Sequence, residues 1–175
     1  MDEALRQRLF DALVGKPLVS NAFRGTLVEA IIAQVLEPTW RWCADGWGSF
    51  DFEGPNGIGL EVKQSAARQN WHGSESQPCT PRFDIAERTG FWDEQSRWTN
   101  RAGRAAAIYV FAWHPLFEPS VADHRDPEQW QFSVISADRL PAQKSIGLAG
   151  IAALANPVCY GELAEEVRRV VVTRK

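Results

Sequence analysis

The sequence predicts an α/β protein with a mixed central sheet flanked by helices and an additional C-terminal helix. Apolar residues recur at helical spacing near both ends of the chain, while the stretch from Trp40 to Gln64 alternates like short strands separated by glycine and proline turns. An almost continuous apolar run, 107–112, indicates a strand covered on both faces. With 175 residues, 45% of them hydrophobic, one domain spanning 1–175 can bury a core without disulfides.

Two helices are expected before the strands. Leu5, Leu9 and Leu13 recur at helical spacing, which predicts a first amphipathic helix ending near Gly15. A second helix runs from about Ser20 or Thr26 to Leu36, with a broad apolar face, and Pro38 stops it.

Three short strands follow, at 41–43, 49–52 and 58–63. The segment Glu53-Gly54-Pro55-Asn56-Gly57 has the composition of a hairpin turn, so Asp51 and Glu61 are predicted to lie on adjacent antiparallel strands. Because side chains alternate along a strand, Glu61 and Lys63 must share one face, while Leu60, Val62 and Gln64 share the other.

The second half of the chain begins with a long polar excursion, 65–104, with a helix expected between Asp93 and Gly103. The buried strand of 105–113 comes next. A loop at 115–128 leads to a half-exposed strand at 131–135. A docked terminal helix is predicted over 161–172, with glutamates early and arginines late.

The cysteines, the hydropathy and the net charge indicate the compartment and the partners to expect. Cys43, Cys79 and Cys159 are far apart and form no CxxC pair, so neither a disulfide framework nor a cysteine zinc site is expected, which is typical of a cytoplasmic protein. The chain has no basic, apolar leader and no apolar run of roughly 18 residues, so no membrane is expected as a partner. The net charge of −3 gives no overall basic excess for nucleic acid, although carboxylates that bind metal ions subtract from any such sum.

Three charged residues in the predicted hairpin carry the chemistry. Asp51 stands between two phenylalanines and faces Glu61 and Lys63, and charges in an apolar setting usually persist for a function. Magnesium takes only one or two carboxylates from a protein and keeps several waters, so an Asp and a Glu across a hairpin suit Mg²⁺ or Mn²⁺. A lysine beside them can assist the attacking water.

The order of these elements resembles the αβββαβ core of the PD-(D/E)XK, or restriction-endonuclease-like, nucleases, over roughly residues 20–136. The resemblance implies that Asp51 and Glu61 bind the metal, that Lys63 assists the water, and that Glu29 of the preceding helix joins the metal shell. It departs from the family pattern at Phe50, where a proline is expected. It further implies an endonuclease whose substrate is DNA. A homodimer is the expected assembly, because two strands are often cut by two copies.

The resemblance also suggests that the stretch after Lys63 leads towards nucleic acid. Gln64, Arg68 and Gln69 could contact phosphates or sugars, and Trp71 could stack on a base. Five arginines could line a phosphate groove or form a solvated surface: Arg82, Arg88, Arg97, Arg101 and Arg104.

Several alternatives stay open. Thr26 and Glu29 have the spacing of a helix capping box, in which Glu29 would only satisfy a backbone N–H. Asp45 is a rival for Asp51, although Ala44-Asp45-Gly46 is typical of a turn. His72, His114 and His124 lack a metal-ligand spacing, and of these His114 could face the site.

Two other functional hypotheses remain. The chain could be a nucleic-acid-binding or assembly module without catalysis that keeps the nuclease fold, or a small enzyme of unrelated chemistry in which these charges are incidental.

Overall fold

The computed structural model of the protein describes residues 1–44, 48–92 and 97–174. Short 3-10 turns lie at Pro55–Gly57, Pro127–Gln129, Ala137–Arg139 and Tyr160–Glu162. The helices and strands in chain order are α1 (Glu3–Leu13), α2 (Asn21–Leu36), β1 (Arg41–Trp42), β2 (Phe52–Glu53), β3 (Gly59–Ala66), β4 (Arg82–Asp84), β5 (Phe91–Trp92), β6 (Trp98–Thr99), β7 (Ile108–His114), β8 (Gln131–Ser136), β9 (Ser145–Gly147), α3 (Leu148–Ala152) and α4 (Leu163–Thr173).

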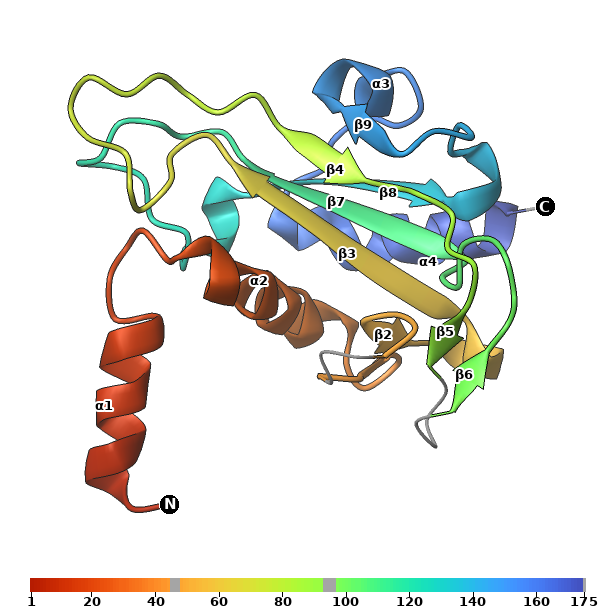
Figure 1. The fold of residues 1–175 in the computed structure, drawn as a ribbon, viewed down its shortest axis with the longest axis horizontal. Coiled ribbons are helices and arrows are strands. Elements are labelled where there is room, and N and C mark those ends of the chain that lie inside the picture. Colours follow the sequence, from red (N-terminus) through yellow and green to blue (C-terminus); the bar gives the residue numbers. More distant parts are fainter. Residues whose placement is uncertain (45–47, 93–96, 175) are drawn as a thin grey trace.

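A five-stranded mixed sheet forms the centre of the molecule, in the order β1-β2-β3-β7-β8 (Figure 1). All neighbouring strands are antiparallel except β3 and β7, which are parallel. Two small two-stranded ribbons, β4–β9 and β5–β6, complete the strand pairing of the described residues. The protein is therefore a mixed α/β fold, as the sequence predicts.

Each face of the sheet has its own apolar core. Helices α2 and α4 cover one face, where Ile32 of α2 and Val167 of α4 are buried with Leu60 and Val62 of β3. The β4–β9 ribbon and α3 cover the opposite face, on the other side of the sheet in Figure 1. There Phe83 packs edge-on against Phe111, with ring centroids 5.4 Å apart.

The helix boundaries decide one of the alternatives left by the sequence. Helix α2 begins at Asn21 with Ser20 as its N-cap, not at Thr26, and it ends two residues before Pro38. Glu29 therefore lies in the interior of the helix, so its role as part of a capping box at Thr26 is wrong.

Two strand and helix predictions need correction. The helix expected between Asp93 and Gly103 is absent from the described part, 97–103, where β6 forms instead, because Trp98 and Thr99 favour a strand and Gly103 has a φ of 122°. Strand β8 is not half-exposed, since five of its six residues, including Ser133 and Ser136, are buried. The β4–β9 ribbon and α3 cover the face that the alternating sequence pattern assigns to solvent.

Helix α1 projects from the body of the molecule (Figure 1) and contains no buried residue. Its predicted apolar positions Leu5 and Leu9 are exposed. None of the helices in the described ranges has the length and apolar character needed to cross a membrane.

Candidate metal site at the β2–β3 hairpin

The hairpin brings Asp51 to Glu61, as its register predicts. Phe52 pairs with Leu60, and the Asp51 N–H donates to the Leu60 carbonyl at 3.0 Å, so Asp51, one residue before the start of β2, stands opposite Glu61. Instead of continuing the strand ladder, the Asp51 carboxylate Oδ2 accepts the Val62 N–H at 2.6 Å. This bond fixes the carboxylate over the middle of the Glu61-Val62-Lys63 segment.

Glu61 and Lys63 lie on the face of β3 opposite the α2 core. The Lys63 Nζ donates to Glu61 Oε1 at 2.5 Å, and both side chains are about three-quarters buried, with 21% of the Glu61 side chain and 26% of the Lys63 side chain exposed. Leu60 and Val62, on the alternate positions, are buried against α2 and β7. The predicted alternation along β3 is confirmed.

The pKa of Asp51 shows how charge is arranged here. The pKa of Asp51 is raised from 3.8 to about 7, chiefly by burial and next by the negative charge of Glu61. Glu29 adds to the rise, whereas the Val62 N–H and the Lys63 ammonium oppose it. A carboxyl in this position is easier to ionise when a cation is added. The electrostatics therefore favour binding of a positive ion at Asp51.

Glu29 contributes to this field from α2. Its Oε2 accepts the indole N–H of Trp42 on β1 at 3.0 Å, which orients the carboxylate within electrostatic range of Asp51. The described residues contain no group of three or more His, Cys, Asp or Glu side chains placed to hold one metal ion. Glu29 thus does not complete a three-ligand group with Asp51 and Glu61 in this structure.

Two carboxylate oxygens remain as donors of the kind that Mg²⁺ prefers. Asp51 Oδ1 and Glu61 Oε2 accept no hydrogen bond from the described residues, because Val62 and Lys63 use only the other oxygen of each carboxylate. Mg²⁺ usually takes one or two carboxylates and completes its octahedron with water. The donor set, oxygen atoms on two partly desolvated carboxylates, therefore suits Mg²⁺ or Mn²⁺ and not a softer metal.

The structure adds neighbours that the sequence does not reveal. Tyr109 on β7 is the register partner of Glu61, and burial followed by the Glu61 charge raises the pKa of Tyr109 to about 12, so its hydroxyl stays protonated at neutral pH. Asp84 of β4 lies within electrostatic range of Lys63. The one sequence feature that singles out Tyr109 is its polar hydroxyl inside the apolar run of β7. No local pattern in the sequence marks Asp84.

The other sequence candidates lie elsewhere. Asp45 falls outside the described residues. His114 pairs with Ala66 at the far end of β7, five residues beyond Tyr109, which corresponds to about 16 Å along a strand. It does not face the carboxylates.

The residues predicted to bind nucleic acid are mostly directed into the protein. Arg24 of α2 donates to Gln64 Oε1 at 2.7 Å and to Gln69 Oε1 at 2.8 Å. The Arg68 guanidinium is buried and lies 4.9 Å from the centre of the Phe117 ring. Only Trp71 is well exposed, at 64%, and contact of these four residues with nucleic acid stays a prediction.

Comparisons of the chain with protein-family models, with curated proteins and with solved structures give no match. The site is therefore interpreted from its own geometry.

His114 and His124 instead form a buried cluster with Trp130. The Val19 N–H donates to His124 Nδ1 at 3.1 Å, so Nδ1 is an acceptor and Nε2 carries the proton towards the Arg68 carbonyl, 3.1 Å away. The hydrogen bonds thus require a neutral ring. Burial lowers the pKa of His124 from 6.5 to about 4, helped by the positive charge of Arg24, and burial also lowers the pKa of His114.

Acid should therefore destabilise the fold through these histidines. A histidine whose pKa is lower in the folded state contributes stability above pH 6.5, and this stability is lost as the pH falls towards 4. We expect the free energy of unfolding, measured in urea, to fall by up to roughly 3 kcal/mol over this window because of His124. His124→Gln, which cannot be protonated, should show a flatter pH dependence than the unchanged protein; an equal dependence would contradict the assignment.

Proposed function

We propose that the chain is a divalent-metal-dependent endonuclease of the PD-(D/E)XK type, with DNA as its substrate. The observation that carries the proposal is the placing of Asp51 against Glu61 and Lys63, by a strand register and a carboxylate bond to the Val62 N–H. If Glu61 and Lys63 were an ordinary surface ion pair, neither their partial burial nor the nearby Asp51 carboxylate would be needed.

The strand order adds support of a second kind. An antiparallel set, β1-β2-β3, followed by a parallel β7 agrees with the strands of the expected αβββαβ core, and α2 precedes them. The core departs from that expectation between β3 and β7, where the described residues form β4, β5 and β6 and no helix. The proposal therefore depends on the hairpin site more than on the whole fold.

The roles of the side chains follow from their positions. When bound, a divalent ion would neutralise the phosphate and make its water more acidic. Asp51 and Glu61 supply the oxygen atoms that hold the ion. The Lys63 ammonium, held at Glu61, is placed to donate to the attacking water or to charge that grows on the phosphate oxygens. Tyr109 keeps a neutral hydroxyl on the same side of the sheet.

The test is cleavage of supercoiled plasmid by the purified chain. With Mg²⁺ or Mn²⁺ we expect nicked and linear products, which EDTA prevents. Lys63→Ala should lower the rate by roughly 10²–10⁴-fold, the usual effect of removing a group that assists proton transfer. Lys16→Ala, an exposed lysine outside the site, serves as the matched control and should cleave like the unchanged protein.

Either of two results would overturn the proposal. Cleavage that persists in Lys63→Ala at the rate of the Lys16→Ala control would remove Lys63 from the site. An absence of cleavage, together with DNA binding that resists EDTA, would favour the hypothesis of a binding module without catalysis.

A further inference from the structure

The β5–β6 ribbon carries two tryptophans whose rings face solvent. Trp92 and Trp98 pair in register, and each is 46% exposed. Their ring centroids are 5.5 Å apart at an interplanar angle of 68°. Tryptophan is usually packed in a core or against a partner, so two adjacent exposed indoles mark a surface on which a partner is expected.

The Trp98 ring is held in place before any partner arrives. Its Nε1 donates to Asn100 Oδ1 at 2.7 Å. The ring also lies so close to Gly90 that a Cβ there would come within 2.7 Å of it, and Gly90 is itself buried. A ring fixed by its own neighbours loses little side-chain entropy when another aromatic group stacks on it.

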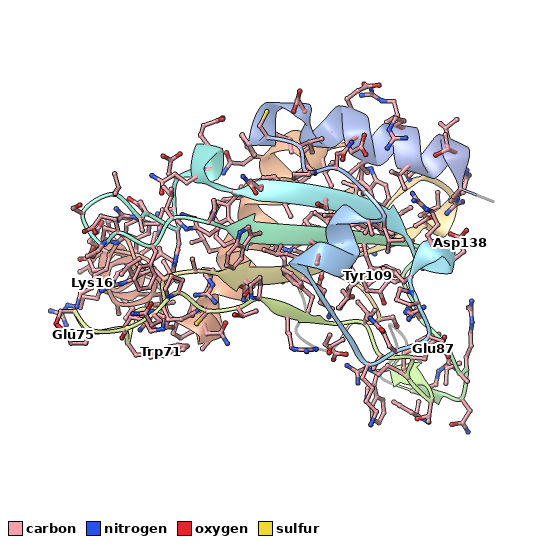
Figure 2. The ribbon with its side chains drawn as sticks, turned by 90° about the horizontal axis from the view of Figure 1, so that it is seen from above. Lys16, Trp71, Glu75, Glu87, Tyr109 and Asp138 are labelled. Carbon is pink, nitrogen blue, oxygen red and sulfur yellow. The ribbon has the colours of Figure 1, made fainter. Side chains whose placement is uncertain are left out.

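The ribbon is attached to the segment that precedes β2 and leads into the candidate metal site. Ser49, two residues before Asp51, donates from its hydroxyl to the Trp92 carbonyl at 2.9 Å. Figure 1 shows β5 and β6 beside β2 and the start of β3. Glu87 lies four residues before β5 and marks the position of the ribbon in Figure 2. The exposed Trp71 lies at the opposite end of the molecule from Glu87. The two tryptophan surfaces are thus separate, and only the β5–β6 surface adjoins the carboxylates.

The segment that leaves the ribbon is basic in a chain whose net charge is −3. Residues 97–104 contain three arginines and no acidic residue. Arg104 is tied to the backbone, since it donates to the carbonyls of Ile85 and Pro141, whereas Arg101 is exposed. Aromatic rings next to arginines are the combination by which proteins hold single-stranded nucleic acid without reading its sequence.

We propose that Trp92 and Trp98 stack the unpaired bases of a single-stranded nucleic acid, whose phosphates Arg101 attracts. In an intact duplex both faces of each base are already covered, so rings of this kind favour single strands. The inference rests on the proposed function in one respect: the strand held at the ribbon is the strand whose phosphate is presented to Asp51 and Glu61.

Binding is measured in EDTA, so that the result does not depend on cleavage. The probe is a fluorescein-labelled, 15-nucleotide thymidine DNA followed by fluorescence anisotropy, alongside an abasic strand of the same length. Trp98→Ala and Trp92→Ala should each weaken binding of the thymidine strand by roughly 5–100-fold, the usual effect of losing one stacked base. Trp98→Phe keeps an aromatic face and should retain most of the affinity, and the exposed Phe10→Ala on α1 serves as the control.

Several outcomes would overturn the inference. The first is that Trp98→Ala and Trp92→Ala bind the thymidine strand as tightly as the unchanged protein does. The second is that the unchanged protein binds the abasic strand as tightly as the thymidine strand, or binds neither. The third is that only Trp71→Ala loses binding. Sedimentation that shows a dimer broken by Trp98→Ala, without DNA binding, would assign the surface to a second copy instead. If the protein binds the thymidine strand through Trp92 and Trp98 but does not cut plasmid, the proposed nuclease activity is contradicted and the proposed base stacking is supported.

Discussion

Replacing Asp51 with asparagine should abolish cleavage and at the same time make the metal-free protein more stable. Asparagine keeps a side-chain oxygen to accept the Val62 N–H, so the local geometry is retained. It removes one of the two carboxylates proposed to hold the ion. Because charge stabilisation by a bound metal ion is worth several kcal/mol, we expect a rate loss of roughly 10³-fold or more.

The gain in stability follows from the charges around Asp51. In the folded protein its carboxyl is desolvated next to Glu61 and within range of Glu29, which raises its pKa from 3.8 to about 7. A carboxyl with a raised pKa costs the folded state nothing below pH 3.8, and the cost develops as the pH rises towards 7. At pH 8 Asp51→Asn should therefore be more stable by about 1–3 kcal/mol, the usual cost of an uncompensated buried polar group.

Urea unfolding of the metal-free proteins at pH 8 and at pH 4.5 checks this prediction. The difference between Asp51→Asn and the unchanged protein should be large at pH 8 and small at pH 4.5. The exposed Asp138→Asn is the matched control and should change stability by less than about 0.5 kcal/mol at either pH. A less stable Asp51→Asn at pH 8, or full cleavage by that variant, would show that the carboxylate is an ordinary structural group.

The local parts of this site could be predicted from the sequence because they depend on short-range rules. The turn chemistry of 53–57 sets the register of the hairpin, and the register alone places Asp51 opposite Glu61. Alternation along β3 then assigns Glu61 and Lys63 to one face. Periodic apolar patterns likewise predict helices α1 and α4, and an almost continuous apolar run predicts strand β7; the structure confirms all three.

The parts that could not be predicted are pairings between distant segments. Strand β4 pairs with β9, which begins 61 residues after β4 ends, and neither three-residue strand has a distinctive pattern. The bond from Trp42 to Glu29 joins a strand to a helix that lies beneath it, which no spacing in the sequence indicates. The burial of Arg24 could not be predicted from the sequence either, because an arginine on a helix is ordinarily expected to face solvent.

Arg24 is expected to be among the most important residues for stability. Its side chain is fully buried, with 2% exposed, and burial lowers its pKa to about 10. Among the described residues it has no carboxylate partner; instead it donates to the side-chain oxygens of Gln64, Gln69 and Asn21. Gln69 in turn donates to the Ala66 carbonyl at the end of β3. Arg24 thus fastens the start of α2 to the strand that carries Glu61 and Lys63.

Arg24→Met should cost about 3 kcal/mol or more of unfolding free energy. Methionine fills the space of the aliphatic stem but leaves two amide oxygens without their donor, that of the buried Gln69 and that of the half-buried Gln64. A buried acceptor left unsatisfied costs about 1–3 kcal/mol. The exposed Arg6→Met, whose partner Glu3 is also exposed, is the matched control and should change stability by less than about 0.5 kcal/mol.

Urea unfolding at pH 7.5, with cleavage assayed well below the midpoint, separates two roles of Arg24. If the residue only holds α2 against β3, Arg24→Met at low temperature should cut DNA more slowly by a modest factor, because Glu61 and Lys63 keep their own strand pairing with β7. A variant as stable as the Arg6→Met control would contradict the structural role. A variant that is stable but inactive would move Arg24 into the chemistry of the site, where its cationic side chain would have to reach the phosphate.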